Sequence, residues 1–270
     1  MKMRVMIGKI GVDRTKKQEV LQQISYWVEE KQSALVVTPY SEMVVYADSD
    51  EDFAQSIAQA DVSVPDGVGI LWAGMYLGNP VHFVPSLFRI PARHVDLFAQ
   101  FPEQVRGSEL IYDVCDMADT ETLRVYLLGG SSAAIESFLQ KSEADYPRMV
   151  ITGSFDGRID ETTDILEVFQ KVADSQSDLV LVHLSVPLQE KWGAGLKEFL
   201  REKDCPGVIC CLGGSLDMMV GYQRPAPRVF RWFGLEWLWR LLCSPRRIRR
   251  IYRAVVEFPL LMRKYKHTKI

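Results

Sequence analysis

The sequence predicts an α/β protein: a Rossmann-like, mostly parallel sheet with helices on both faces, followed by a basic helical C-terminal appendage. Short apolar runs alternate with helical stretches, and several of the runs end in glycine-containing turns, which is typical of a parallel sheet. The appendage is indicated by charge. Residues 221–270 hold 13 Lys and Arg against two Asp and Glu, a balance of +11, which leaves −14 for residues 1–220.

Short apolar runs in the first half of the sequence predict its strands and helices. The run ALVVTPY at residues 34–40 predicts a strand, and residues 44–60 predict one long helix. DVSVPDG at residues 61–67 is a β-like run that ends in Pro and Gly, so we expect a strand and then a tight turn. VGILWAGMYLG at residues 68–78 is apolar on all sides and predicts a buried helix.

In the second half, strand and helix patterns alternate. RVYLLGGSS at residues 124–132 predicts a strand that meets a Gly-Gly turn, and a helix is expected at 133–146. Strands are then expected at 149–157 and 178–187, with helices at 161–176 and 188–202, and a last strand leads into a turn within 207–219. The composition changes near residues 220–223. We therefore expect an α/β domain over residues 1–220, able to fold alone, and a separate basic segment over residues 221–270.

Composition excludes several classes of protein. The five cysteines form no CxxC pair and predict reduced cytosolic thiols, and the four histidines match no metal-ligand spacing, so no metal or cofactor is expected. The N-terminal apolar run is too short for a signal peptide, and no uninterrupted apolar stretch of about 18 residues predicts a membrane span. A basic tail on an acidic body predicts an anionic partner, either a membrane surface or a nucleic acid.

Four motifs stand at expected strand ends, where sheets of this class bind ligands. Asp66 in VPDG is placed to take a proton from a hydroxyl, and Gln189 in PLQEKW can donate and accept hydrogen bonds to a base or sugar. In the same motif, Glu190 is expected on a solvated face and Trp192 in the core. The other two motifs are LLGGSS, with Gly129 and Gly130, and CLGGSLD, with Gly213, Gly214 and Asp217. Each motif is also compatible with a plain turn or helix cap, but together the four predict a nucleotide-type ligand.

The order of these motifs, ending in PAPRVFRWFGLEWLWRLLCSPRR, resembles the WecG/TagA/CpsF family of bacterial glycosyltransferases over about residues 35 to 253. The resemblance implies an inverting, metal-independent hexosyltransferase. Its donor would be a UDP-sugar, typically of the N-acetylmannosamine type, and its acceptor a polyprenyl-diphosphate-linked sugar used for teichoic acid or another surface polysaccharide. It also implies that Asp66 is the general base and that Thr38, Gln189 and Asp217 lie near the donor.

Several positions depart from the family pattern. Tyr40 stands where the family usually has Asn, and Gln104 and Glu109 replace Arg and Asp in the family's RVxGxDL motif. The stretch between Asp66 and that motif is about twenty residues longer than the resemblance predicts. These departures leave open a different donor sugar, or a non-catalytic relative that binds a nucleotide sugar or scaffolds a polysaccharide assembly. Arg106 and Arg89 are candidates for the missing charge.

The basic segment carries aromatic and leucine side chains at helix-like spacings with arginines between them, a pattern that favours a helix lying in a bilayer interface. We expect a cytoplasmic protein held peripherally on the inner face of the cell membrane. The same pattern also fits a core helix, a homo-oligomer interface or, less well, a nucleic-acid-binding helix, since the aromatics do not lie on an exposed sheet. The candidate residues for the acceptor diphosphate and the membrane are Arg224, Arg228, Arg231, Arg240, Arg246 and Arg247.

Overall fold

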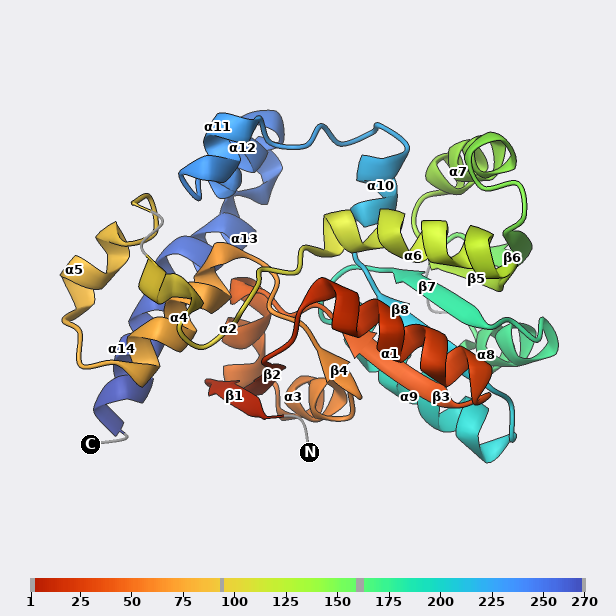
Figure 1. Ribbon diagram of the computed structural model, residues 1–270, viewed down its shortest axis with the longest axis horizontal. Coiled ribbons are helices and arrows are strands. Elements are labelled where there is room, and N and C mark those ends of the chain that lie inside the picture. Colours follow the sequence, from red (N-terminus) through yellow and green to blue (C-terminus); the bar gives the residue numbers. More distant parts are fainter. Residues whose placement is uncertain (1–2, 93–94, 159–162, 269–270) are drawn as a thin grey trace.

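The computed structural model describes residues 3–92, 95–158 and 163–268, and its centre is a parallel sheet (Figure 1). The strand order is β4-β3-β8-β7-β5-β6, and every neighbouring pair is parallel. A small antiparallel hairpin of β1 (Arg4–Ile7) and β2 (Ile10–Asp13) precedes the sheet. The sheet strands are β3 (Ser33–Val37), β4 (Val62–Ser63), β5 (Arg124–Gly129), β6 (Val150–Phe155), β7 (Leu179–His183) and β8 (Gly207–Cys211). The predicted fold class is confirmed.

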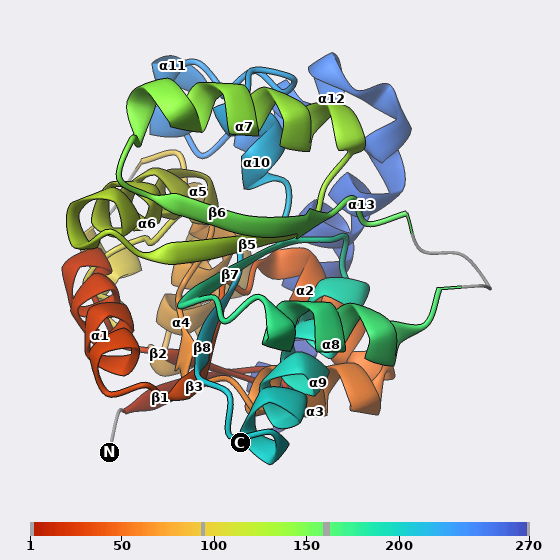
Figure 2. The same cartoon turned by 90° about the vertical axis from the view of Figure 1, so that its right-hand side faces the viewer.

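Helices cover both faces because the strand side chains alternate between two apolar clusters. In β3, Leu35 and Val37 enter one cluster, and Ala34 and Val36 enter the other. Figure 2 shows α6 and α7 on one side of the sheet and α8 and α9 on the other. The first cluster packs against α2 (Ser41–Ser49), α3 (Glu51–Ala58), α4 (Val68–Gly78), α8 (Ile165–Asp174) and α9 (Leu188–Glu202). The second packs against α1 (Lys17–Glu29), α6 (Gly107–Glu121), α7 (Ser132–Asp145) and α10 (Ser215–Met219).

The single helix predicted over residues 44–60 is wrong, because the chain forms two helices there, α2 and α3. The break is at Asp50, whose backbone is extended with φ −118° and ψ 101°. Its side chain accepts a hydrogen bond from the backbone N–H of Phe53, which satisfies one of the unpaired donors at the start of α3. Lys191 of α9 pairs with the other carboxylate oxygen of Asp50 at 2.9 Å. Asp50 therefore ends α2, caps α3 and links α3 to the start of α9 through its ion pair.

The connection between α4 and α6, residues 79–106, was not assigned to any element from the sequence. It contains α5 (Phe83–Phe88) and the short 3-10 helix η1 (Val95–Phe98). Phe83 packs against the rings of Trp72 and Tyr76 in α4. At its other end, the connection touches the C-terminal segment. A Cβ atom added to Gly234 would lie 2.7 Å from Ile90 Cγ2, so the Ile90 side chain packs directly on the Gly234 backbone.

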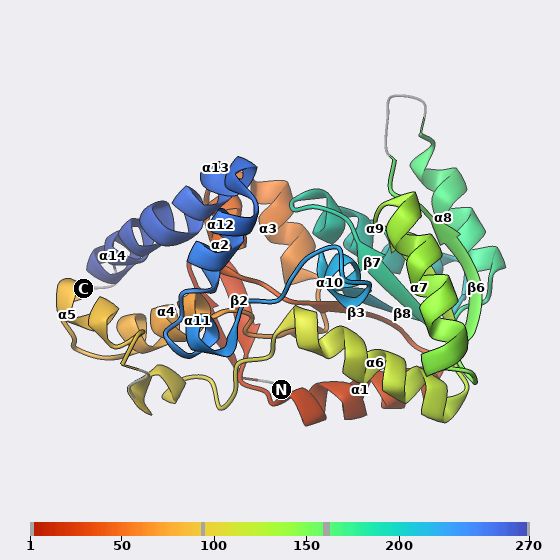
Figure 3. The same cartoon turned by 90° about the horizontal axis from the view of Figure 1, so that it is seen from above.

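The C-terminal segment begins with an irregular stretch over residues 221–227, is mostly helical over residues 228–268, and runs from above α4 down to its far side (Figures 1 and 3). Its elements are α11 (Arg228–Trp232), α12 (Glu236–Cys243), η2 (Pro245–Arg247), α13 (Ile248–Tyr252), the π-helical turn η3 (Arg253–Glu257) and α14 (Phe258–Thr268). Within the described residues, we find no helix that combines the length and the apolar character needed to cross a bilayer.

The two halves of this segment differ in burial. Residues of α11 to α13 are half-buried or exposed, whereas Phe258 and Met262 of α14 are 1% and 0% exposed and belong to the first apolar cluster. Lys266 Nζ donates hydrogen bonds to the carbonyls of Tyr76, Asn79 and Val81 at 2.8–2.9 Å, at the C-terminal end of α4. The last helix is therefore built into the core of the α/β body. The domain boundary near residue 220 stays a prediction.

Candidate active site

A cavity of about 740 Å³ opens at the carboxyl ends of four neighbouring strands. Thr38 follows β3, Asp66 follows β4, His183 ends β7 and Gly213 follows β8, and all four line the cavity. Ligands bind at this edge in parallel α/β sheets because the strand-to-helix loops meet there. The cavity brings together six of the residues singled out from the sequence: Thr38, Asp66, Gln189, Gly213, Gly214 and Asp217.

Asp66 is held in place by the backbone of three chain segments. Its own N–H donates to the carbonyl of Pro39 at 3.2 Å, and Gly67, with φ +83°, turns the chain into α4. The backbone N–H of Gly107 donates to the Asp66 carboxylate. A Cβ on Gly107 would lie 3.3 Å from Thr38 Oγ1 and 3.5 Å from Asp66 Oδ2. A glycine at the start of α6 therefore allows the helix to approach both side chains.

The electrostatic setting of Asp66 suits proton transfer near neutral pH. Desolvation, opposed by the charges of Arg240 and Arg106, raises the pKa of its carboxyl to about 7, and Glu236 adds to the rise. Asp66 is nonetheless partly accessible from the cavity. A carboxyl group whose pKa lies close to the ambient pH can accept and return a proton with little cost, as a general base requires. Sequence alone predicted the carboxylate but not the shift in its pKa, because the shift comes mainly from desolvation in the folded protein.

Gln189 lines the cavity and also supports the fold through one hydrogen bond at each of its amide atoms, and its contact with the donor stays a prediction. Its Oε1 accepts from the N–H of Gly213 at 2.6 Å, and its Nε2 donates to Glu190 Oε1 at 2.9 Å. His183 Nδ1 lies 3.0 Å from the Gly213 carbonyl, and burial lowers the pKa of this imidazole to about 4, so it is neutral and Nδ1 carries the proton. Gln189 and His183 therefore fix the turn after β8 from both sides.

The remaining glycines of the sequence motifs lie elsewhere. Gly129 and Gly130 have φ values of +99° and +92°, and neither lines the cavity. A Cβ on Gly129 would lie 2.7 Å from Leu184 and 2.8 Å from the backbone of His183. These glycines serve close packing between β5, β7 and the loop at Gly157, and a direct role for them in donor binding stays a prediction.

Three of the six predicted arginines reach the cavity. Arg231, Arg240 and Arg247 line it, whereas Arg224, Arg228 and Arg246 do not. Arg231 pairs with Glu109 at 3.5 Å, and Arg106 pairs with Glu236 at 3.4 Å. These two ion pairs join α6 to α11 and α12. The C-terminal segment thus forms one wall of the cavity and is held there by charge.

Comparison with known proteins agrees with this geometry. The family model described as "Glycosyl transferase WecG/TagA/CpsF family" matches residues 5–89 and 90–270. The chain belongs to this glycosyltransferase family. The predicted resemblance is therefore confirmed over nearly the whole chain, including the long connection between α4 and α6.

Named relatives of this WecG/TagA/CpsF member carry one description, N-acetylglucosaminyldiphosphoundecaprenol N-acetyl-beta-D-mannosaminyltransferase. The Bacillus spizizenii strain W23 protein is 28% identical over 225 residues, 83% of this chain and 77% of the relative. The Bacillus subtilis strain 168 protein is 24% identical over 244 residues, 90% and 84% of the two chains. The Staphylococcus aureus strain NCTC 8325 protein is 27% identical over 216 residues, 80% and 74%.

Two departures from the WecG/TagA/CpsF pattern have structural partners. The Tyr40 hydroxyl accepts from Arg250 Nη2 at 2.7 Å, and Arg250 Nε pairs with the buried Glu42 at 2.9 Å. Gln104 Oε1 accepts from Arg106 at 3.1 Å and so holds that guanidinium near Asp66. Of the two candidate arginines, Arg106 reaches the site and Arg89 pairs with Asp96. Arg250 was missed as a site residue because only the fold brings it to Tyr40.

The QEKW motif of this WecG/TagA/CpsF member corrects one expectation and confirms another. Glu190, expected on a solvated face, is 0% exposed, and desolvation raises the pKa of its carboxyl to about 7. It is buried because the α9 start faces the β8 turn, where Gln189 donates to it. Trp192 was expected in the core, and it packs between Phe155 and Phe169.

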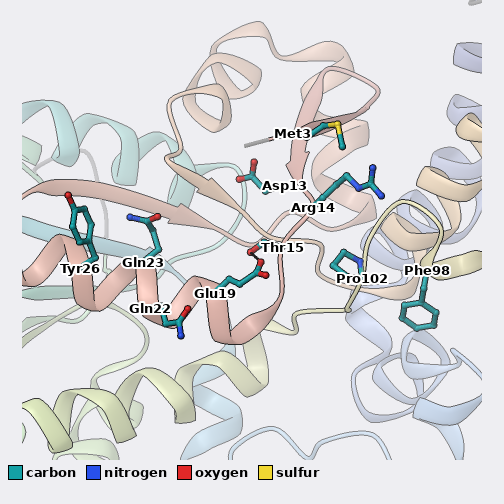
Figure 4. A pocket seen from close by; sticks show the side chains of 10 residues that line it. All are labelled: Met3, Asp13, Arg14, Thr15, Glu19, Gln22, Gln23, Tyr26, Phe98 and Pro102. Carbon is teal, nitrogen blue, oxygen red and sulfur yellow. Dashed lines mark hydrogen bonds between the residues drawn. The ribbon is translucent and has the colours of Figure 1, made fainter. Parts of the chain in front are cut away.

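A second cavity, of about 870 Å³, lies between β2, α1 and residues 98–102 (Figure 4). Its polar groups serve the fold. Asp13 accepts from Arg4 and from the backbone N–H of Ser63, and Thr15 donates to Glu19 at 3.0 Å. In Figure 4, Gln23 and Tyr26 stand along α1. None of the predicted site residues lines this cavity, so the function is assigned to the cavity around Asp66.

Proposed function

We propose that the protein transfers an N-acetylmannosamine-type sugar from a UDP-sugar to a polyprenyl-diphosphate-linked acceptor, with inversion at the anomeric carbon. The observation that carries the proposal is Asp66, a carboxyl of pKa about 7 at a strand end, in one cavity with Arg231, Arg240 and Arg247. The relatives' names support the sugar and the acceptor. Synthesis of a cell-surface polysaccharide such as teichoic acid is the proposed setting.

In this mechanism Asp66 takes the proton from the acceptor hydroxyl as its oxygen attacks the anomeric carbon. The bond from that carbon to the UDP oxygen breaks on the opposite side, and UDP leaves with its electron pair. Arginines stabilise the charge that develops on the departing diphosphate. Among the described residues, no group of His, Cys, Asp and Glu side chains is arranged to hold a metal ion. We therefore propose that arginines take the part that a divalent cation plays in other transferases.

The proposal is tested by measuring UDP release from a panel of UDP-sugars with an N-acetylglucosaminyl-diphosphoryl-prenyl acceptor. We expect UDP-N-acetylmannosamine to be the preferred donor and EDTA to leave the rate unchanged. Loss of activity in EDTA with recovery in Mg²⁺ would show that the metal-free mechanism is wrong. Tight donor binding without any UDP release would favour the non-catalytic relative instead, a possibility raised by Tyr40 and Gln104.

We further propose that the C-terminal segment holds the protein on an anionic membrane face. Arg246 and Arg249 are exposed, and near them Leu242, Ile248 and Tyr252 are 63%, 54% and 53% exposed. Cations beside exposed apolar side chains match the headgroup and acyl boundary of a bilayer. A second copy of the chain could cover the same side chains, and it would compete with lipid.

The double variant Arg246→Glu/Arg249→Glu is expected to bind vesicles of anionic lipid at least about tenfold more weakly, since each cation near such a surface contributes roughly 1 kcal/mol. Neither residue lines the cavity. Co-sedimentation measures the effect, and binding of the parent should weaken as salt rises. The matched control, Arg201→Glu/Lys203→Glu, makes the same charge change at the end of α9, far from α12 and α13 in Figure 1. Equal losses in both variants would contradict a specific anchor.

A further inference from the structure

The lining of the cavity around Asp66 differs in polarity from one side to the other, and the strand order explains this difference. Because β4 is the edge strand, Thr38, Gly213 and His183, at the ends of β3, β8 and β7, all lie to one side of Asp66. On the other side, beyond the sheet edge, lie the α4–α6 connection and the C-terminal segment (Figure 3). Val68, two residues after Asp66, approaches Gly234 of that segment. The polar groups at the ends of β3, β8 and β7 therefore lie on one side of Asp66.

On the far side of the cavity, apolar side chains of these two segments form what we call the two-segment wall, and Gln104, Arg231, Glu236 and Arg240 of the same segments also line the cavity. Its lining side chains are Leu87, Ile90, Pro91, Leu97 and Phe98 from the connection, and Trp232, Phe233, Leu235 and Trp237 from the C-terminal segment. The segments meet where Ile90 packs on Gly234. Neither segment could form the wall alone, because each contributes about half of its side chains.

The apolar character continues outward onto the surface of the same two segments. Phe88 and Val95 of the connection are 70% and 77% exposed, and Trp232 and Phe233 are 60% and 44% exposed. A surface on which exposed apolar side chains adjoin an apolar cavity is a binding site more often than other parts of a protein surface are. Among the lining residues, Arg231 immediately precedes Trp232 in α11, so a cation stands where the apolar wall begins.

Resting on the proposed function, we infer that the two-segment wall binds the isoprenoid chain of the acceptor next to its diphosphate. The base, the arginines and the apolar wall follow one another in the cavity in the same order as the sugar, the diphosphate and the hydrocarbon in such an acceptor. A sugar hydroxyl would meet Asp66, the diphosphate would meet the arginines, and the hydrocarbon would meet the wall. Bilayer lipid and a second copy of the chain do not match this order, because neither presents a hydrocarbon chain joined to a diphosphate.

Binding of soluble prenyl diphosphates tests this without turnover. We expect farnesyl diphosphate to bind the parent at least tenfold more tightly than isopentenyl diphosphate, because its longer chain buries more apolar surface. The variant Phe98→Gln/Trp232→Gln should lose this preference while its affinity for isopentenyl diphosphate stays within twofold. Trp232→Leu, which stays apolar, should keep the preference. Leu166→Gln is the matched control, since Leu166 is 64% exposed on α8, away from the cavity.

A diazirine-bearing farnesyl diphosphate locates the chain directly. Label is expected in peptides that cover residues 87–91, 97–98 and 231–237, and unlabelled farnesyl diphosphate should displace it. Label confined to residues 248–260, or a glutamine variant that keeps the chain-length preference, would overturn the inference. So would a variant that changes only vesicle binding or only self-association. These readouts do not depend on sugar transfer, so a chain that binds prenyl diphosphate but releases no UDP would refute the proposed function alone.

Discussion

Asp66→Asn is expected to lower the rate of sugar transfer by about 10²–10⁴-fold, the usual contribution of a general base. Asparagine keeps the size of the side chain and can still accept a hydrogen bond from Gly107, but it cannot take the acceptor proton. Affinity for the UDP-sugar, measured by calorimetry, should change little, because Arg231, Arg240 and Arg247 remain in place. A transfer rate within tenfold of the parent would remove Asp66 from this role.

The pH dependence follows from the direction of the Asp66 shift. The base acts as a carboxylate, so transfer by the parent should rise with pH through the pKa of about 7 and then level off. Because the pKa of Asp66 is raised in the folded state, this group makes the folded protein less stable as pH rises from the unfolded pKa of 3.8 to the folded pKa of about 7. Asp66→Asn has no such titration. Its stability relative to the parent should therefore increase across this range, and thermal melts at pH 5 and pH 8 measure the difference.

Phe258→Ala is expected to lower the free energy of unfolding by about 3–5 kcal/mol, the usual cost of truncating a buried phenylalanine. Phe258 is 1% exposed and packs against Trp72 with ring centroids 6.1 Å apart. A loss of this size is a large part of the stability of a typical domain. Urea titration followed by tryptophan fluorescence measures this loss. A protein truncated after residue 220, which lacks α14 altogether, should be destabilised further.

Leu260→Ala is the matched control, because Leu260 lies on the same helix and is 53% exposed. Its free energy of unfolding should stay close to that of the parent, within about 0.5 kcal/mol. A cost below about 1 kcal/mol for Phe258→Ala would mean that α14 is dispensable to the body. The boundary expected near residue 220 would then stand as first predicted.

The sequence identified much of the cavity because its motifs are local. A strand followed by Pro-Asp-Gly places Asp66 at the carboxyl end of the sheet whatever surrounds it, and the same holds for Thr38 and Gly213. The local sequence pattern gave wrong predictions where the same side chain can serve two structural roles. Asp50 caps a new helix instead of continuing one, and Glu190 turns inward toward Gln189. Neither choice is visible from residue spacing.

Three features could be predicted from the amino-acid sequence alone: the fold class, the strand ends that carry Asp66 and its neighbours, and the concentration of positive charge in residues 221–270. The strand ends follow from short local runs, and the charge needs only a count over residues 221–270. Three others become visible only in the folded chain: which arginines reach the cavity, that Arg250 meets Tyr40, and that Phe258 lies in the core. The reason is physical: a charge pattern records that a segment is basic, but pairing and burial depend on residues about 190 to 210 positions away.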